Sequence, residues 1–126
     1  MMQRREFVGH AATALALAGT ASPIIEGYRM EDMYGLIGQM KVAPDKRRDI
    51  IALLAGATRD MAGNIAYLIA EDLEDDSSIW ITEVWQTKTD HANSLKLPSV
   101  QDAIAKARPH ITGFGTRVET KPIARD

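Results

Sequence analysis

The chain contains no cysteine among its 126 residues. Disulfide bonds, thiol nucleophiles and cysteine-bound metals are therefore excluded, and the composition is compatible with an oxidising compartment. Histidine is also scarce, and neither His91 nor His110 has the H-x-x-x-H spacing or the acidic cluster of a metal site. Glycine-rich phosphate loops and Ser-His-Asp patterns are missing as well. We therefore expect neither a metal site nor a nucleotide phosphate site.

The chain also has no large excess of charge of one sign and no long apolar run. The formal net charge of −2 gives no reason to expect a nucleic-acid partner. No apolar run is long enough to span a bilayer as a helix, and no basic amphipathic stretch indicates a membrane surface. With 45% apolar and 25% charged residues, the composition is that of an ordinary soluble domain. The length allows one domain with one core.

Residues 1–22 have the layout of an export signal. Arg4 and Arg5 are followed by a weakly apolar, alanine-rich run over residues 7–18 and then by small residues. The paired arginines resemble the twin-arginine signal of bacteria, so we expect a periplasmic or secreted protein. The alternative is a disordered N-terminal extension on a cytoplasmic protein. Residues 23–32 are expected to be a linker, and residues 123–126 a short tail.

Apolar periodicity over residues 33–122 predicts four strands and two helical regions in the order β-α-β-β-α-β. The strands are expected at residues 33–42, 64–73, 78–86 and 110–121. The helices are expected at residues 44–63, 87–97 and 99–108, the last two separated by Pro98. Gly63 is expected to end the first helix, Thr89 or Asp90 to cap the second, and Ser99 to cap the third. The basic residues of the first helix, Arg47 among them, are expected on its solvated side.

This order of elements is the ferredoxin-like α+β arrangement, in which helices cover one face of the sheet. The other face, carrying Trp80 with Val84 or their neighbours, would be bare and apolar in a monomer. A second copy packed sheet to sheet would cover it. We therefore expect a homodimer.

Trp85 and His91 form the most functional-looking pair in the chain. Trp85 ends the third strand, and His91 is expected on the first turn of the helix that follows. A helix N-terminus disfavours the imidazolium, so a histidine there tends to stay neutral and able to accept a proton. A pocket below it, with Trp85, Leu95, Val100 and Ile104 as walls, would suit a flat aromatic ligand.

Glu83 points to the same side of the third strand as Trp85. A carboxylate in a core-facing position needs a partner, for which Arg108 and His110 are the candidates. Tyr67, on the second strand, joins this group only if the hairpin register places it on the same face. A hairpin loop of five residues does so and one of four does not, and the sequence leaves both open.

The segments I-W-I-T-E-V-W and S-L-K-L-P-S-V, with A-I and R-P-H-I-T-G-F after them, resemble the antibiotic biosynthesis monooxygenase or quinol monooxygenase family. The resemblance implies a dimeric α+β barrel. It also implies oxygenation of a quinol or polyketide-type aromatic by dioxygen, without metal or flavin. His91 would be the general base, acting with Trp85. The resemblance is consistent with substrate contacts from Tyr67, Glu83 and Leu95.

Two other readings of the same residues stay open. The chain could be a dimeric module that binds a small apolar ligand without turnover, or a lactone isomerase-like enzyme on the same fold.

Overall fold

Four antiparallel strands form the central sheet of this chain, whose computed structural model describes residues 24–25, 28–123 and 125. The strands are β3 (Tyr34–Val42), β4 (Asn64–Glu71), β5 (Ser78–Trp85) and β6 (Ile111–Thr120). They are arranged in the order β4-β5-β3-β6, so that β5 and β3 are central. This is the ferredoxin-like α+β fold that the sequence predicts.

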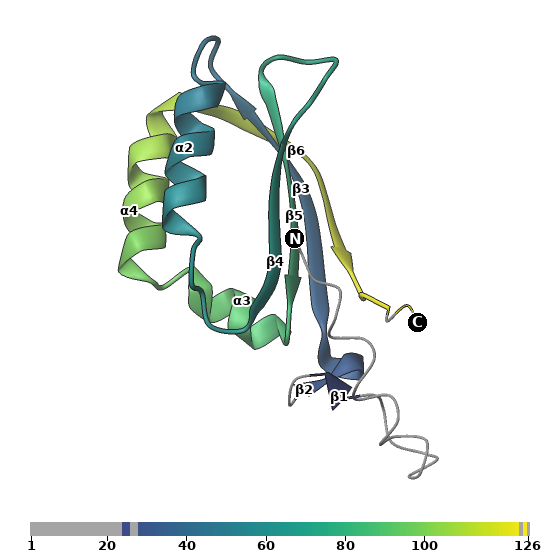
Figure 1. Ribbon diagram of the computed structural model, residues 1–126. Coiled ribbons are helices and arrows are strands. Elements are labelled where there is room, and N and C mark those ends of the chain that lie inside the picture. Colours follow the sequence, from purple (N-terminus) through teal and green to yellow (C-terminus); the bar gives the residue numbers. More distant parts are fainter. Residues whose placement is uncertain (1–23, 26–27, 124, 126) are drawn as a thin grey trace.

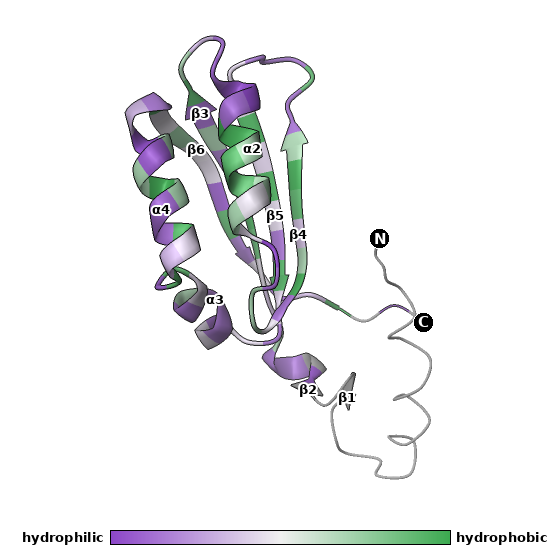
Figure 2. Cartoon of the chain, turned by 60° about the vertical axis from the view of Figure 1, so that its left-hand side comes forward, coloured by the Kyte–Doolittle hydropathy of each residue, from purple (hydrophilic) through white to green (hydrophobic). Residues whose placement is uncertain are grey.

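Among the described residues, three helices complete the fold: α2 (Arg47–Ala57), α3 (Lys88–Ser94) and α4 (Pro98–Ala107). Figure 1 shows α2 and α4 side by side on one face of the sheet, with α3 at the end of the sheet where β5 finishes. A short 3-10 turn, η3 (Arg108–His110), connects α4 to β6. Figure 2 shows apolar residues along both α2 and β4, which are two of the elements that enclose the core. The opposite face of the sheet carries none of these helices.

Before the sheet, the structure describes two short strands and a turn: β1 (Ile24–Ile25), β2 (Tyr28–Arg29) and η2 (Met30–Asp32). These lie in the predicted linker. The predicted export signal, residues 1–22, lies outside the described residues, so it stays a prediction. Within the described part of the chain, no helix has the length and apolar character needed to cross a bilayer.

The helix ends differ from those predicted. The first helix ends at Ala57, with Thr58 as its C-cap, and Gly63 lies in the following loop with a φ of 80°. Thr87 caps α3, because its side chain accepts a hydrogen bond from the Asp90 backbone N–H at 3.0 Å. The predictions of Gly63 as helix end and of Thr89 or Asp90 as cap were therefore wrong.

The start of α4 also corrects the prediction. Pro98 is its first residue and Leu97 its N-cap, so Ser99 lies inside the helix and does not cap it. Proline suits this position, because its φ is preset for the helix and the N–H that it lacks would be unpaired anyway. The helical region is interrupted before Pro98, as predicted, and Pro98 itself is the first residue of α4.

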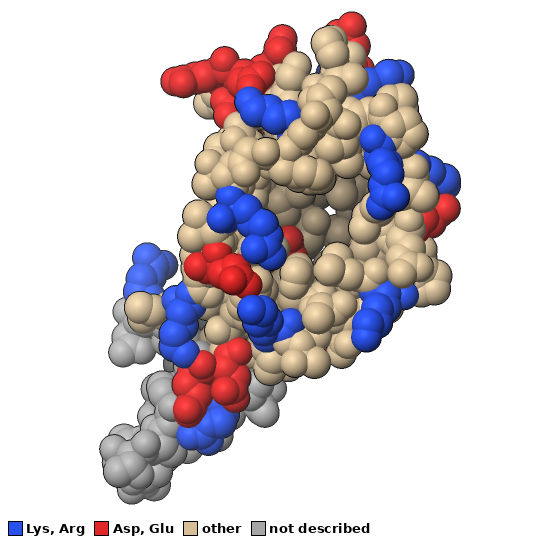
Figure 3. Space-filling view, turned by 180° about the vertical axis from the view of Figure 1, so that it is seen from behind, with Lys and Arg blue, Asp and Glu red and all other residues tan. Residues whose placement is uncertain are grey.

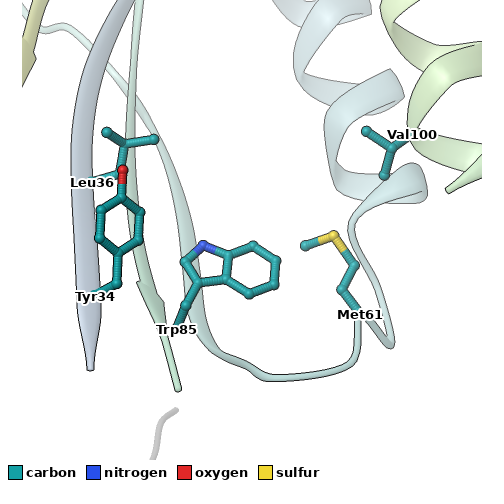
Figure 4. Close-up of a cluster of buried hydrophobic side chains, with 5 residues drawn as sticks. All are labelled: Tyr34, Leu36, Met61, Trp85 and Val100. Atoms are coloured by element: carbon teal, nitrogen blue, oxygen red, sulfur yellow. The ribbon is translucent and has the colours of Figure 1, made fainter. Parts of the chain in front are cut away.

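The core has two clusters between the sheet and the helices. One joins Val42, Ile50, Leu54, Ile79 and Ala107 at the end of the sheet near the start of α2. The other surrounds Trp85 at the opposite end (Figure 4), and its further buried members are Tyr34, Leu36, Met61 and Val100. The second cluster positions the candidate site.

The hairpin register settles the position of Tyr67. Tyr67 on β4 pairs with Glu83 on β5, and Ile69 pairs with Ile81. Directly paired residues point to the same face of an antiparallel sheet. Tyr67, Glu83 and Trp85 therefore lie together on the face that the helices cover.

Candidate functional site

A cavity of about 170 Å³ lies against the sheet, and all its lining residues come from β3, β5 and β6. Figure 3, the view from behind, shows the molecule hollowed there, with basic side chains around the opening and acidic atoms at its depth. The surface that lines the cavity is mostly apolar, and two of the lining residues are charged. The lining residues are Leu36, Gly38, Gln39, Met40, Ile81, Glu83, Phe114, Thr116 and Arg117.

Glu83 is the buried acidic group of this cavity. Its side chain is only 12% exposed. Its Oε1 accepts a hydrogen bond from Trp85 Nε1 at 2.9 Å and lies 3.8 Å from His91 Nε2. Arg108 and His110, the partners proposed from the sequence, make neither of these contacts, so that prediction was wrong. The actual partners lie two and eight residues further along the chain, where β5 turns into α3.

The environment of Glu83 raises the pKa of its carboxyl group. Burial raises the pKa of Glu83 above its usual range, because a charge in an apolar site loses its hydration. The Trp85 hydrogen bond and the charges of His91 and Arg117 oppose this rise without cancelling it. A carboxylate with such a raised pKa is a better base than an ordinary glutamate.

Trp85 is completely buried, with 0% exposure. Figure 4 shows its indole between Tyr34 on β3 and Met61 in the loop after α2. Trp85 is not among the residues that line the cavity, whereas its neighbours Leu36 and Glu83 are. The indole therefore lies outside the cavity wall, and its N–H orients the Glu83 carboxylate by a hydrogen bond.

His91 lies on α3 beside this group, with a side chain that is 14% exposed. Its ring is 5.7 Å from the ring of Trp85, edge to face, and 5.5 Å from that of Tyr34. His91 is the fourth of the seven residues of α3 rather than a first-turn residue in a long helix. The structure thus brings His91, Trp85 and Glu83 together.

Tyr67 packs against the Trp85 cluster from β4, opposite Glu83. Burial raises the pKa of the Tyr67 hydroxyl, and the nearby negative charge of Glu83 raises it further. Tyr67 is therefore a neutral phenol at physiological pH and can serve as a hydrogen-bond donor.

Tyr34 flanks His91 on its other side, and the sequence pattern indicates only that it is a strand residue. Its hydroxyl donates a hydrogen bond to Glu119 Oε2 at 2.7 Å, and Lys88 Nζ lies 3.2 Å from the same oxygen. Burial, with the hydrogen bond and charge of Glu119, raises the pKa of Tyr34. These contacts tie the end of β6 to the start of both β3 and α3. A buried tyrosine needs a partner for its hydroxyl, which is the sequence signal that could have singled it out.

Leu95 and Arg117 lie differently from what the sequence suggested. Leu95, predicted to contact substrate, is 47% exposed at the end of α3 and does not line the cavity. Arg117 on β6 lines the cavity, although no pattern in the sequence singled it out. Its register partner on β3 is Gly38, whose missing side chain leaves room in front of β3.

The site offers a carboxylate and an imidazole beside an apolar cavity. This arrangement can take a proton from a hydroxyl group of a bound ring and shield the resulting anion from water. Within the described part of the chain, no three acidic or histidine side chains come together as metal ligands would.

Comparison with known proteins places this chain in a family. The family model for antibiotic biosynthesis monooxygenase matches residues 33–106. The fold is also similar to that of a solved protein from Chloroflexus aurantiacus J-10-fl, described as a candidate antibiotic biosynthesis monooxygenase. The two are 46% identical, with a TM-score of 0.72, over 75% of this chain and 96% of that one.

Two more distant structures share the fold alone. A conserved protein from Methanosarcina mazei Go1 is 13% identical with a TM-score of 0.65, over 73% of this chain and 94% of its own. Rv0793 from Mycobacterium tuberculosis is 18% identical with a TM-score of 0.63, over 74% of this chain and 97% of its own. No curated protein matches the chain. The family match and the 46% identical structure show that this chain belongs to the antibiotic biosynthesis monooxygenase family.

Proposed function

We propose that this chain is a cofactor-independent monooxygenase that acts on a quinol or similar phenolic ring. The observation that carries the proposal is the pairing of Glu83 with His91 beside an apolar cavity. His91 Nε2 and Glu83 Oε1 are 3.8 Å apart, and both side chains are shielded from solvent. Such a pair can remove the hydroxyl proton that makes a phenolic ring reactive towards dioxygen.

The volume of the cavity favours a single-ring substrate. An engineered protein cavity of about 150 Å³ holds one benzene molecule. The cavity here, at about 170 Å³, accommodates one ring with small substituents, whereas a three-ring polyketide-type aromatic needs more space. We therefore favour a hydroquinone over a polycyclic substrate.

The reaction balances without a further redox partner. Proton removal by the His91–Glu83 pair leaves an electron-rich anion, which transfers electrons to dioxygen. One oxygen atom enters the ring and the other leaves as water, so a hydroquinone and dioxygen give a hydroxyquinone and water. The apolar lining keeps bulk water away from the intermediate anion.

Oxygen uptake in the presence of a simple hydroquinone tests this function. Uptake that a chelator leaves unchanged, and that His91→Gln lowers by about 100-fold, is expected if His91 supplies base catalysis. The matched control is His110→Gln, which changes a histidine that does not contact Glu83 as His91 does. Ring binding without oxygen uptake would contradict the enzyme and support the ligand-binding module instead.

The proposal also covers the oligomeric state of the protein and its location in the cell. We propose a homodimer formed through the sheet face that the helices leave open, where Leu68 and Val118 are exposed. A second copy of this face would cover both residues. Export by the N-terminal segment would place the activity outside the cytoplasm.

A further inference from the structure

We propose that Glu83 is the first acceptor of the substrate's hydroxyl proton, and that His91 receives the proton from Glu83 instead of from the substrate. This inference rests on the proposed function and assigns the proton path within its site. The positions of the two residues relative to the cavity are its starting point. Glu83 lines the cavity, whereas His91 is not among the lining residues. A ring in the cavity therefore meets the carboxylate before it meets the imidazole.

The two oxygens of Glu83 have different surroundings. Oε1 accepts the Trp85 N–H at 2.9 Å and faces His91 Nε2 at 3.8 Å. No hydrogen bond from the described residues reaches Oε2. A buried carboxylate oxygen without a donor is costly, and a ligand hydroxyl would supply that donor. Oε2 is thus the atom on which the substrate hydroxyl would rest.

The groups around Glu83 suit a proton acceptor. Tyr67 approaches from β4, His91 from α3 and Arg117 from β6, while Leu36 supplies an apolar wall from β3. Burial raises the pKa of Glu83, which brings it nearer to the working pH of the enzyme, where a base is most effective. The Trp85 N–H fixes the carboxylate, so that its orientation does not depend on the ligand.

Each proton transfer conserves charge. The phenol O–H bond breaks as an O–H bond forms on Glu83, which leaves a phenolate beside a neutral carboxyl group. The carboxyl proton then passes to His91 Nε2, and Glu83 becomes a carboxylate again. The 3.8 Å separation exceeds a hydrogen bond, so Glu83 and His91 must close by about 1 Å for the second step. Catalytic hydrogen bonds are often long before the ligand binds and tighten afterwards.

The test uses para-nitrophenol with the full chain, because this phenol resists oxidation and its anion absorbs visible light. The absorbance of the bound probe reports its ionisation without any turnover. We expect wild-type protein to bind the probe largely as the phenolate below the pH at which the free probe ionises. Glu83→Gln should bind the probe but lower its bound phenolate fraction at least tenfold at that pH. Glu74→Gln, a substitution in the exposed hairpin loop, should match the wild type.

Two results of the absorbance experiment would overturn the proposal. The first is a Glu83→Gln protein that ionises the probe as the wild type does. The second is a wild-type protein that binds the probe only as the neutral phenol, or does not bind it at millimolar concentration. Oxygen uptake by the wild type is measured separately. A phenolate that depends on Glu83, without oxygen uptake, would sustain the proton path and refute the monooxygenase.

A second measurement applies if Glu83→Gln does not fold. In His91→Gln, the proton cannot move beyond Glu83. Infrared difference spectra of this variant should gain the C=O band of a protonated carboxyl group when para-nitrophenol binds. The absence of that band, with the phenolate still formed, would mean that another group takes the proton.

Discussion

Glu83 Oε1 lies between two nitrogen atoms, 2.9 Å from Trp85 Nε1 and 3.8 Å from His91 Nε2. All three residues come from nine positions of the chain, where the central strand β5 turns into α3. The short connection fixes the carboxylate, the indole and the imidazole relative to one another. The cavity meets this group through Glu83 alone, so the carboxylate is where substrate and catalytic machinery meet.

Glu83→Gln should change how the stability of the protein depends on pH. The folded protein raises the pKa of Glu83 above its ordinary value of 4.5, so it binds more protons than the unfolded chain above that pH. The free energy of unfolding should therefore fall as the pH rises through this window, by about 1.4 kcal/mol for each unit of pKa difference. Glutamine carries no charge, so urea unfolding should show Glu83→Gln gaining stability relative to the wild type as the pH rises.

Glu74→Gln, on the exposed loop between β4 and β5, controls for the chemical change itself. Parallel stability curves for the wild type and Glu83→Gln would contradict a raised pKa at Glu83.

The sequence predicted the fold and the meeting of Trp85 with His91, because both follow from local patterns. Alternation along β5 places Trp85 and Glu83 on one face, and chain continuity brings α3 to the same end of the sheet. The order β-α-β-β-α-β then leaves few arrangements for the sheet. The family resemblance predicted the same fold. The family match confirms the resemblance, and the strand order confirms the fold.

The residues contributed by other elements could not be predicted in the same way. The position of Tyr67 depends on the hairpin register, which a change of one residue in the loop would reverse. Arg117 reaches the cavity because β6 pairs with β3 across a register shift, and alternation along β6 alone does not reveal such a shift. The exposure of Leu95 follows from the early end of α3 at Ser94, just before Pro98 begins α4.

Arg47→Ala should destabilise the protein, contrary to the solvated position predicted for this residue. Its Nη1 donates to the backbone carbonyls of Asp72, Asp75 and Ser78 at 3.0, 2.9 and 3.1 Å. These bonds hold the hairpin loop against the start of α2. Without them the free energy of unfolding should fall by about 1–3 kcal/mol, as measured by urea denaturation.

The neighbouring Arg48→Ala is the matched control, because Arg48 is exposed. It should change the stability by less than about 0.5 kcal/mol. Equal effects of the two substitutions would show that charge, and not the carbonyl contacts, accounts for the loss.

Gly63→Ala and Gly56→Ala should change the stability in opposite directions. Gly63 has a φ of 80°, and a Cβ there would overlap the side chain of Asp90 on α3. The substitution should cost about 1–3 kcal/mol through backbone strain alone. A Cβ on Gly56, within α2, would meet open space, so alanine there should stabilise the protein by about 0.5–1 kcal/mol.

Thermal unfolding of both variants measures these effects. Since Asp90 precedes His91, Gly63→Ala should also reduce hydroquinone-dependent oxygen uptake, whereas Gly56→Ala should not. Stabilisation by alanine at both positions would refute the strained backbone at Gly63.

Leu68→Glu should convert the proposed dimer into a monomer. Leu68 is 58% exposed on β4, and its neighbours Tyr67 and Ile69 point to the helices, so Leu68 points to the open face of the sheet. In a sheet-to-sheet dimer its side chain would be buried, and an unpaired carboxylate there would be costly. Analytical ultracentrifugation should give a dimer mass for the wild type and a monomer mass for Leu68→Glu. Leu73 lies in the hairpin loop and is 98% exposed, so Leu73→Glu should leave the dimer intact. A monomeric wild type would contradict the proposed dimer.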